Sequence, residues 1–346
     1  MEWKLAEEQE AYRDTLREWL TDVAPLDRVR EWSDGGDRRA FADRMAADGW
    51  LGVGVAEELG GQGGGVVELA LTAEALGRAV APNSSWLATM LAVPALGAMP
   101  DRTAAWLCPA EAPPAPVELD VSPDGALTGT VPRVLAGSEV SAFVVAVSTQ
   151  AGLELRRVEV DDSVSRSDRQ LLDRTRTVAD LTLDATSSIK LDADAERAIA
   201  SSVDLCAVLL AADALGAMER MLELAVGYSL QRRQFGVPIG SFQAMKHAAA
   251  TIEVDVEASR SAVYYAAASL EAGLGEASLH AAAVKSQVTA AAARAADSAL
   301  TMHGAIGYTW EHDLHLFYKR AQLDAHLAGT AAEWNERIAR GLALVG

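Results

Sequence analysis

The stretch QRRQFGVPIGSFQA, residues 231–244, lies at the junction of two long alanine-rich segments, 197–230 and 241–272. Alanine has the strongest helix propensity of all residues, so both segments are predicted to be helices. At the junction, glycine and proline at positions 236, 238 and 240 interrupt the helical pattern. Farther along, 275–300 and 331–344 have the same composition, and a second loop lies near 304–312. We therefore predict a helical bundle over residues 194–346.

The sequence changes character before this helical part. Prolines cluster at positions 109, 113, 114 and 116, and short apolar runs follow at 142–147, 153–160 and 178–183. Apolar runs of this length, separated by turn residues, are typical of β-strands. We predict a small, shortened β domain over residues 105–193.

The N-terminal part is again predicted to be helical, over residues 1–104. Within residues 4–48, four apolar side chains recur at near-helical spacing among charged residues, namely Leu5, Tyr12, Leu16 and Leu20. Two more helices are expected at 66–80 and 86–100. The glycine-rich loop at 57–65 lacks the spacing of a phosphate-binding or dinucleotide-binding loop. The predicted fold class is mainly α, with an inserted β domain.

The composition limits the classes of partner. The 346 residues carry a formal net charge of −19, and 50% of them are hydrophobic. Nucleic-acid binding needs Lys and Arg to neutralise phosphates, so no nucleic-acid or anionic-membrane partner is expected. The two isolated cysteines, Cys108 and Cys206, make no disulfide framework. The N-terminal residues show no signal peptide, and no uninterrupted apolar run of about 18 residues suggests a membrane helix, so we expect a cytoplasmic protein.

Three stretches together resemble signatures of one enzyme family. They are residues 231–244, the stretch MHGAIGYTWE at 302–311, and the stretch GWLGVGVAEELGGQG at 49–63. In this order and spacing they resemble the acyl-CoA dehydrogenase family, over essentially the whole chain and least over 100–190. The resemblance implies an N-terminal helical domain, a middle β-barrel-like domain and a C-terminal four-helix bundle. It also implies tetramers that bind FAD between subunits, with the adenosine and pyrophosphate end held by a neighbouring chain.

The resemblance assigns roles to cofactor-binding residues. Arg232 matches the family's pyrophosphate-binding arginine, Phe235 offers an aromatic face near the adenosine, and Gln243 can bond the ribose and pyrophosphate. Taken without the resemblance, Arg232 is equally a solvated helix end and Phe235 equally a core residue. At the second loop the family's usual glutamine is Thr301, and Ala305 replaces a glycine. The full predicted set is Arg232, Phe235, Gln243, Thr301, Gly304, Ala305 and Thr330.

The residue that would act as catalytic base is missing. The family removes an α-proton from an acyl-CoA with a glutamate in a Tyr-Glu-Gly-Thr segment, which here reads Leu-Ala-Gly-Thr at 327–330, with Ala328 at the base position. Some members carry the glutamate on the first bundle helix, which corresponds here to Cys206. The middle-domain loop that touches the flavin and the thioester is shortened at 107–114, and the strand beside the flavin, at 131–137, lacks the family's tryptophan and threonine.

These losses lead to a preferred interpretation and two alternatives. The preferred one is a subunit of a heteromeric acyl-CoA dehydrogenase, in which a partner subunit supplies the glutamate, acting on a bulky substrate such as a steroid side-chain acyl-CoA. The first alternative is a homo-oligomeric enzyme with a displaced base, Asp204 or Glu111. The second is a non-catalytic structural or interaction protein on the same fold. No metal site is expected, because His312 and His315 have no further ligands nearby.

Overall fold

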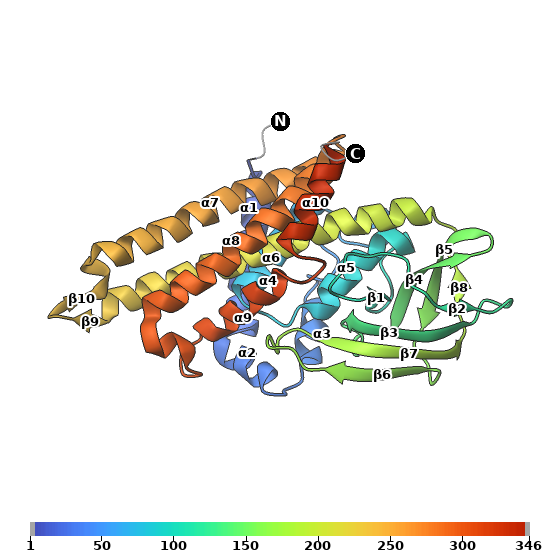
Figure 1. Cartoon of the computed structure of the whole chain (residues 1–346), viewed down its shortest axis with the longest axis horizontal. Coiled ribbons are helices and arrows are strands. Elements are labelled where there is room, and N and C mark those ends of the chain that lie inside the picture. Colours follow the sequence, from blue (N-terminus) through green and yellow to red (C-terminus); the bar gives the residue numbers. More distant parts are fainter. Residues whose placement is uncertain (1–3, 343–346) are drawn as a thin grey trace.

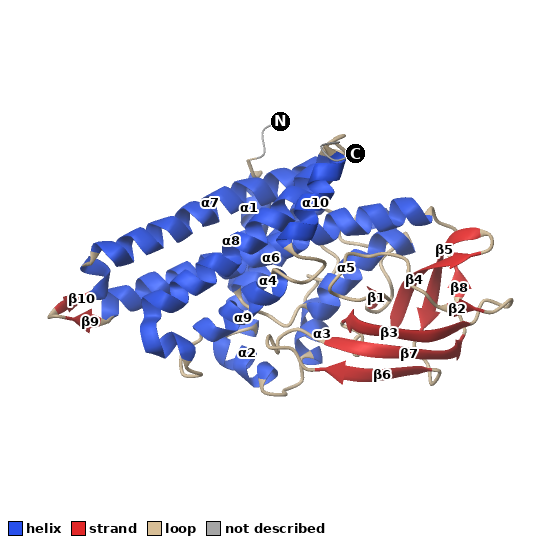
Figure 2. Ribbon diagram, viewed as in Figure 1, coloured by secondary structure: helices blue, strands red, loops and turns tan. Residues whose placement is uncertain are grey.

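The computed structural model describes residues 4–342, and it has the predicted fold class (Figures 1 and 2). The N-terminal helices are α1 Glu7–Val23, α2 Leu26–Ser33, α3 Arg39–Ala47, α4 Val66–Arg78 and α5 Ser84–Leu96. The strands of the middle domain are β1 Ala104–Trp106, β2 Asp120–Val121, β3 Leu127–Leu135, β4 Ala142–Thr149, β5 Gly152–Glu159, β6 Val164–Arg169, β7 Val178–Thr186 and β8 Ile189–Lys190. The C-terminal helices are α6 Ala195–Gln231, α7 Gln243–Glu271, α8 Ala277–His303, α9 Leu314–Asp324 and α10 Ala331–Gly341.

The central element is α6, a helix of 37 residues that contacts α4, α5, α7, α8 and α9. It is apolar on all sides, as expected for a helix enclosed by others. By length and composition it could cross a membrane, but 83% of its most apolar window is buried inside the protein. This burial identifies α6 as the core helix of the bundle.

The middle domain consists of two four-stranded sheets, with strand orders β1-β4-β5-β8 and β2-β3-β7-β6. Along β4, Phe143, Val145 and Val147 pack into the core between the sheets. The alternate residues, including Val144 and Ala146, face the helical core instead. Since side chains alternate along a strand, β4 is buried on both faces and appears in the sequence as a continuous apolar run.

The N-terminal helices and the bundle meet at a close helix crossing. A Cβ atom added to Gly77 in α4 would lie 2.0 Å from the backbone oxygen of Asp213 in α6. A Cβ added to Gly216 would likewise lie 1.9 Å from the backbone oxygen of Glu74. Side chains are therefore excluded at both positions, and the two backbones pack directly against each other.

A buried ionic network joins all three parts of the chain. Arg320 of α9 is fully buried and donates to Asp173 in the β6–β7 connection at 2.7 Å and to Asp213 of α6 at 3.1 Å. Arg176 forms ion pairs with Asp213 at 2.9 Å and with Asp324 at 3.2 Å. Arg320 also donates to the backbone oxygen of Ala81 at 2.9 Å, so the network includes the α4–α5 connection.

Among the elements that were absent from the sequence-based prediction are helix α9 and strand β6. Helix α9, Leu314–Asp324, was not among the predicted helical segments, and strand β6, Val164–Arg169, was not among the predicted apolar runs. Both contain many polar residues. Helix α9 nevertheless buries Leu314, Phe317 and Arg320, and β6 is held along its whole length by its antiparallel pairing with β7.

Candidate cofactor site

A hairpin projects from the end of α6 and α7 and carries the first predicted motif (Figure 1). Its strands are β9 Arg233–Gln234 and β10 Val237–Pro238, joined by a two-residue turn, Phe235–Gly236. The φ angles of the turn residues are +52° and +80°. Two positive φ angles match a type I′ turn, which favours Asn, Asp or Gly at the first position. A phenylalanine there is strained, by about 1 kcal/mol or more.

The side chain of this strained residue is also exposed to solvent. Phe235 is 92% exposed, and its ring meets Phe242 edge-to-face with centroids 6.2 Å apart. Phe235 is therefore not a core residue, which removes one of the two interpretations that the sequence left open. A local strain combined with an exposed aromatic ring indicates a contact with another molecule.

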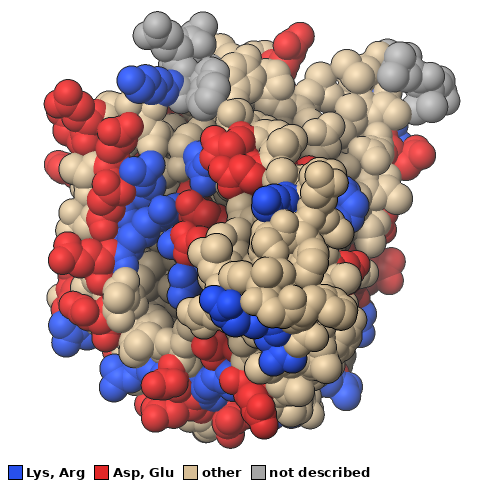
Figure 3. All heavy atoms as spheres, turned by 90° about the vertical axis from the view of Figure 1, so that its left-hand side faces the viewer, with Lys and Arg blue, Asp and Glu red and all other residues tan. Residues whose placement is uncertain are grey.

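The predicted polar residues lie beside this ring. Arg232 ends α6 and is exposed, and its guanidinium has no hydrogen-bond or ion-pair partner within residues 4–342. Gln243 is the first residue of α7 and is also exposed. The end of the molecule that bears the hairpin faces the viewer in Figure 3, where a broad uncharged area carries a few basic side chains and acidic ones gather along the left and lower edges.

The second motif lies at the same end of the bundle. Tyr228, in the last turn of α6, stacks on His303 at the end of α8 with ring centroids 4.8 Å apart. Gly304 follows directly, with φ +64° and ψ −144°, a conformation that favours glycine. Thr301, Gly304 and Ala305 are all exposed. The structure thus places residues 301–305 at the end of the bundle that bears the hairpin, because His303 stacks on Tyr228 of α6, about 70 residues earlier in the chain.

Thr330 lies elsewhere. It is the N-cap of α10, and its backbone nitrogen and hydroxyl both donate to Glu333, at 2.7 and 2.8 Å. The preceding residue, Gly329, accepts a hydrogen bond from Lys285 at 3.0 Å. Lys285 lies about five turns, or about 27 Å, from His303 along α8. Thr330 therefore belongs to a different region from the hairpin group.

This second region brings together the three segments in which the sequence shows losses. The backbone nitrogen of Ala328 donates to the oxygen of Ala110 at 2.8 Å, and the nitrogen of Ala110 donates to the oxygen of Arg133 on β3 at 2.9 Å. Trp334 Nε1 also donates to the oxygen of Ala328 at 2.8 Å. The loop after β1 is therefore bonded both to strand β3 and to the loop at 325–330.

The space left between these segments is small and apolar. Ala328 and Cys206 line the same cavity, whose volume is about 40 Å³. Small-molecule sites usually have about 300–1,000 Å³. Burial raises the pKa of the Cys206 thiol to about 12, and that of Cys108, which also lines the cavity, to about 12. At neutral pH both side chains are therefore protonated thiols, which cannot accept a proton as a catalytic base does.

Comparison with known proteins identifies the family. Residues 6–102 match the family model described as "Acyl-CoA dehydrogenase, N-terminal domain", and residues 197–343 match "Acyl-CoA dehydrogenase, C-terminal domain". Acyl-CoA dehydrogenase IpdE2 of Mycolicibacterium smegmatis is 30% identical over 340 residues, which cover 96% of this chain and 98% of that protein. The chain belongs to the acyl-CoA dehydrogenase family.

Further relatives and solved structures are also similar to this chain. IpdE2 of Mycobacterium tuberculosis is 34% identical over 286 residues, 82% of this chain and 80% of that protein. The crystal structure of the ChsE4–ChsE5 complex from Mycobacterium tuberculosis contains a chain that is 25% identical, with a TM-score of 0.87 and 100% coverage of both chains. The Tcur3481–Tcur3483 steroid ACAD has the same fold, with a TM-score of 0.84, 24% identity and 98% coverage of both chains.

FAD is the cofactor of this family, and the two regions differ in how well they fit it. At the hairpin, an unpartnered guanidinium and an exposed aromatic ring suit a pyrophosphate and an adenosine. At the family's base positions, a cavity of about 40 Å³ cannot contain an isoalloxazine ring together with a thioester. Among the described residues, the hairpin thus carries groups that suit the far end of FAD, and the cavity lined by Ala328 and Cys206 is too small for a flavin ring.

The two displaced-base candidates lie outside this cavity. Glu111 is exposed and paired with Arg133, which holds the pKa of its carboxyl below the usual value. Asp204 on α6 accepts a hydrogen bond from Ser278 of α8 at 2.5 Å. Burial raises the pKa of Asp204. Neither carboxylate lines the space at Ala328 and Cys206.

Amide substitutions at these positions are expected to leave turnover unchanged. Replacing Glu111 with Gln or Asp204 with Asn should change kcat of the assembled enzyme by less than about two-fold, since removal of a true general base costs about 100-fold or more. Steady-state rates with an artificial electron acceptor measure the effect. A 100-fold loss of kcat in either variant, with FAD content preserved, would identify that residue as the base. It would also reject the interpretation in which a partner subunit supplies the catalytic glutamate.

Several residues of the site escaped the sequence analysis. Tyr228 and His303 join the two motifs by their stacked rings. Lys285 is fully buried, donates to the backbone oxygens of Asp324 and Gly329 at 3.0 Å each, and so holds the loop that contains Ala328. Burial lowers the pKa of Lys285 to about 8. A lysine within an alanine-rich helix gave no signal of this role. Among residues 4–342, no group of three or more His, Cys, Asp or Glu side chains is placed to hold a metal ion.

Proposed function

We propose that this chain is one subunit of a heteromeric acyl-CoA dehydrogenase and contributes FAD contacts to a site whose catalytic glutamate comes from a partner subunit. The proposal rests on the contrast between the hairpin and the cavity lined by Ala328 and Cys206. Phe235 and Arg232 are uncovered at the hairpin, whereas Ala328 and Cys206 enclose about 40 Å³. A chain with this contrast can hold a cofactor's far end for another chain, but it has no room for the reaction itself.

In the assembled enzyme, the bound flavin would accept the hydride that leaves the acyl β-carbon. The residues of this chain would act only by binding and orientation. Arg232 would pair with the pyrophosphate through its planar fork, and Phe235 would lie against the adenosine. Gln243 has donors and an acceptor for ribose and phosphate oxygens. The exposed backbone at Gly304 would allow the cofactor to approach closely.

Two relatives support a shared site. The similar chain in the ChsE4–ChsE5 structure belongs to a complex of two differently named chains. FadE34 of Mycobacterium tuberculosis is 32% identical over 351 residues, which cover 96% of this chain but only 48% of that protein. About as much sequence again lies outside the match, which leaves room for a second unit of similar size. A bulky acyl-CoA such as a steroid side-chain thioester is the substrate class that we propose, by analogy with the steroid ACAD complex.

Purification of the chain alone tests the proposal. We expect the lone chain to retain little FAD and to turn over acyl-CoA at least about 100-fold more slowly than the complex, because it lacks the general base. Flavin absorbance and reduction of an artificial electron acceptor measure both properties. The co-expressed complex should contain one FAD for each pair of chains.

A variant of the partner separates the possible outcomes. Replacing the partner's glutamate with glutamine should abolish turnover while the complex keeps its flavin. Full flavin content and full turnover in the lone chain would reject the proposal. A complex without flavin would favour the purely structural alternative.

A further inference from the structure

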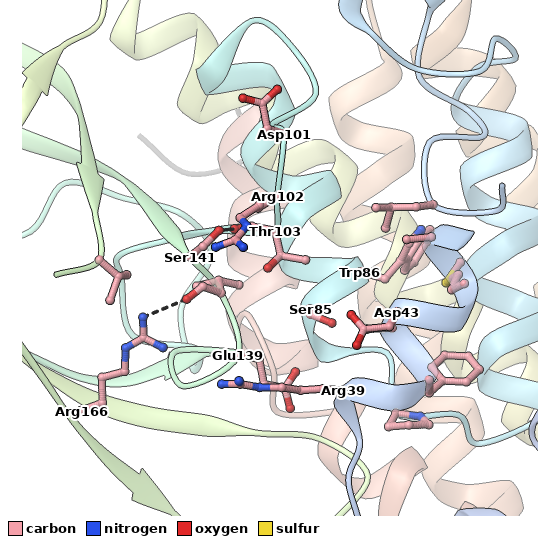
Figure 4. A pocket seen from close by; sticks show the side chains of 18 residues that line it. Arg39, Asp43, Ser85, Trp86, Asp101, Arg102, Thr103, Glu139, Ser141 and Arg166 are labelled. Carbon is pink, nitrogen blue, oxygen red and sulfur yellow. Dashed lines mark hydrogen bonds between the residues drawn. The ribbon is translucent and has the colours of Figure 1, made fainter. Parts of the chain in front are cut away.

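A cavity of about 590 Å³ lies between the N-terminal helices and the middle domain, and the charges in its walls balance. Its charged lining residues are three arginines and three acidic residues, namely Arg39, Arg102, Arg166, Asp43, Asp101 and Glu139 (Figure 4). Because neither sign of charge prevails, the lining favours neither an anion nor a cation. A more unusual arrangement of ionisable groups lies at the end of the bundle that carries the hairpin.

Three rings meet at this end of the bundle and join three segments of the chain. His303, the last residue of α8, is 3% exposed. Its ring stacks on Tyr228 of α6, with centroids 4.8 Å apart, and meets His312 of the loop before α9, with centroids 4.5 Å apart. Aromatic contacts at these distances are favourable beyond the area that they bury, so the rings tie the ends of α6 and α8 to this loop.

The hydrogen bonds of the two imidazoles are satisfied by neutral rings. Nδ1 of His303 lies 2.7 Å from the backbone oxygen of Ala299, so it carries a proton and donates. Nε2 of His303 is buried and has no hydrogen-bond partner within residues 4–342. Nδ1 of His312 instead accepts from the backbone nitrogen of Leu314 at 3.2 Å, which places the proton of its neutral ring on Nε2.

The ring stack links two groups of the candidate cofactor site. Tyr228 lies one helical turn before Arg232, whose backbone nitrogen donates to the oxygen of Tyr228 at 2.8 Å. His303 directly precedes Gly304, which ends α8. A Cβ atom added to Gly307 would lie 3.0 Å from the Cβ atom of His303, so the turn at 304–308 packs closely on this residue. The stack therefore fixes the end of α6 relative to the turn.

We propose that His303 is a positioning residue for the cofactor. Held between Tyr228 and His312 as a neutral ring, it keeps Arg232 and the backbone at Gly304 in one arrangement, in which both can contact the same FAD. A ligand that needs both segments binds more tightly when their arrangement is fixed beforehand. This role rests on the proposed function, since it takes FAD as the ligand at the hairpin.

A proton on His303 would disturb this arrangement. Burial lowers the pKa of His303, and the charge of His312 lowers it further, although the backbone oxygens of Ala299 and Leu224 oppose the change. Because the lowered pKa disfavours a proton in the ordered site, the arrangement is fully favoured above the usual value of about 6.5 and is lost as the pH falls below it. The affinity for FAD should therefore fall on acidification.

Other ionisable groups surround the last three turns of α8. They are Tyr228 of α6, Asp255 of α7, Asp297 of α8 itself, His312 and Asp313 of the loop, Tyr318 of α9 and Arg30 of α2. Histidine is the side chain that ordinarily titrates between about pH 5 and 8, so His312 is the neighbour that shares this range. Burial lowers the pKa of His312 as well. Two imidazolium rings so close together would repel each other, which adds to the effect of acid.

The affinity of the co-expressed complex for FAD, measured by flavin fluorescence between about pH 8 and 5.5, tests this role. We expect the dissociation constant of the wild type to rise at least about five-fold over this range. His303→Phe keeps a ring that can stack on Tyr228 but cannot take up a proton. It should bind FAD within about two-fold of the wild type near pH 8 and lose most of the pH dependence. His303→Ala removes the ring and should weaken binding at least about five-fold at every pH.

The matched control is His326→Phe. Nδ1 of His326 also bonds to the backbone oxygen four residues earlier, that of Gln322, at 2.8 Å, but this side chain is exposed and lies in the loop at 325–330. His326→Phe should keep the affinity and the pH profile of the wild type. If His303→Ala does not fold, the profiles of the wild type and of His303→Phe still decide.

The outcomes separate this role from the proposed function. A wild-type complex whose affinity for FAD does not change with pH, or a His303→Phe complex with the pH profile of the wild type, would overturn the role of His303 alone. A wild-type complex that binds no FAD at any pH would overturn both the role and the proposed function.

Discussion

Replacing Arg232 with alanine in the assembled enzyme is expected to weaken FAD binding about 10- to 100-fold, because charge-assisted hydrogen bonds contribute about 1.5–3 kcal/mol. Arg232 is exposed at the end of α6 and has no partner within residues 4–342, so its removal breaks no contact that stabilises the chain. The fold and the assembly should therefore survive. Flavin retained after dialysis, and the FAD concentration needed to restore activity, measure the loss.

Neighbouring substitutions make the test specific. Arg233→Ala removes the same charge one residue away, from a guanidinium that donates to Gly236 within the hairpin at 3.3 Å. It should have a much smaller effect on FAD. Arg232→Lys keeps the charge but loses the planar fork and should fall between the two. Equal flavin loss in Arg232→Ala and Arg233→Ala would mean that net charge alone matters, and that the assigned role of Arg232 is wrong.

Replacing Arg320 with methionine is expected to destabilise the chain by about 3–5 kcal/mol, which is usual when one partner of a buried ion pair is removed. The substitution leaves Asp173 and Asp213, both buried, without the guanidinium that now lies 2.7 and 3.1 Å from them. Methionine fills a similar volume, so the loss would reflect charge rather than a cavity. The midpoint and slope of urea unfolding give the change in free energy.

The matched control is Asp324→Asn. Burial, followed by the neighbouring Asp213, raises the pKa of Asp324 well above its usual value, which favours the neutral form of its carboxyl. Asparagine keeps the shape of the neutral group, and we expect a change of less than about 1 kcal/mol. A loss as large as that of Arg320→Met would show that Asp324 is ionised in the folded chain.

The pH dependence supplies a further check. Although burial opposes it, Arg320 and Arg176 hold the pKa of Asp213 below its usual value. A lowered pKa contributes stability that is present above the unfolded-state value of about 4 and is lost as the pH falls below it. The difference in stability between the wild type and Arg320→Met should therefore narrow as the pH falls below about 4. A constant difference would mean that Asp213 is not coupled to Arg320.

The parts of the fold that the sequence predicted are those in which composition and burial agree. Helices α6, α7 and α8 are long and alanine-rich, and β4 is a continuous apolar run. Helix α9 was missed because Arg320 and Asp324 are ionisable yet fully buried, whereas a sequence pattern assigns ionisable residues to the surface. Strand β6 was missed because its sequence, VSRSDR, has one apolar residue and depends on backbone pairing with β7.

The candidate site shows the same limit. Arg232, Phe235 and Gln243 were found because a short contiguous motif carries them. The stacking of Tyr228 on His303 was not found, since it joins the ends of two helices that are distant in sequence. Substitutions such as Ala328 revealed that a base is missing. They could not reveal that Ala328 would bond to Ala110 and close the space, because this requires two loops to meet.

The uncovered hairpin has a consequence for the life of the chain in the cell. Phe235 is 92% exposed, and Leu230 and Val254 nearby on α6 and α7 are each 67% exposed. Exposed apolar side chains promote aggregation and are the features by which chaperones and proteases select unassembled proteins. An excess of this chain over the proposed partner subunit would therefore be removed or would precipitate. In the heteromeric enzyme that we propose, balanced synthesis of the two subunits would therefore be a condition for the abundance of the enzyme.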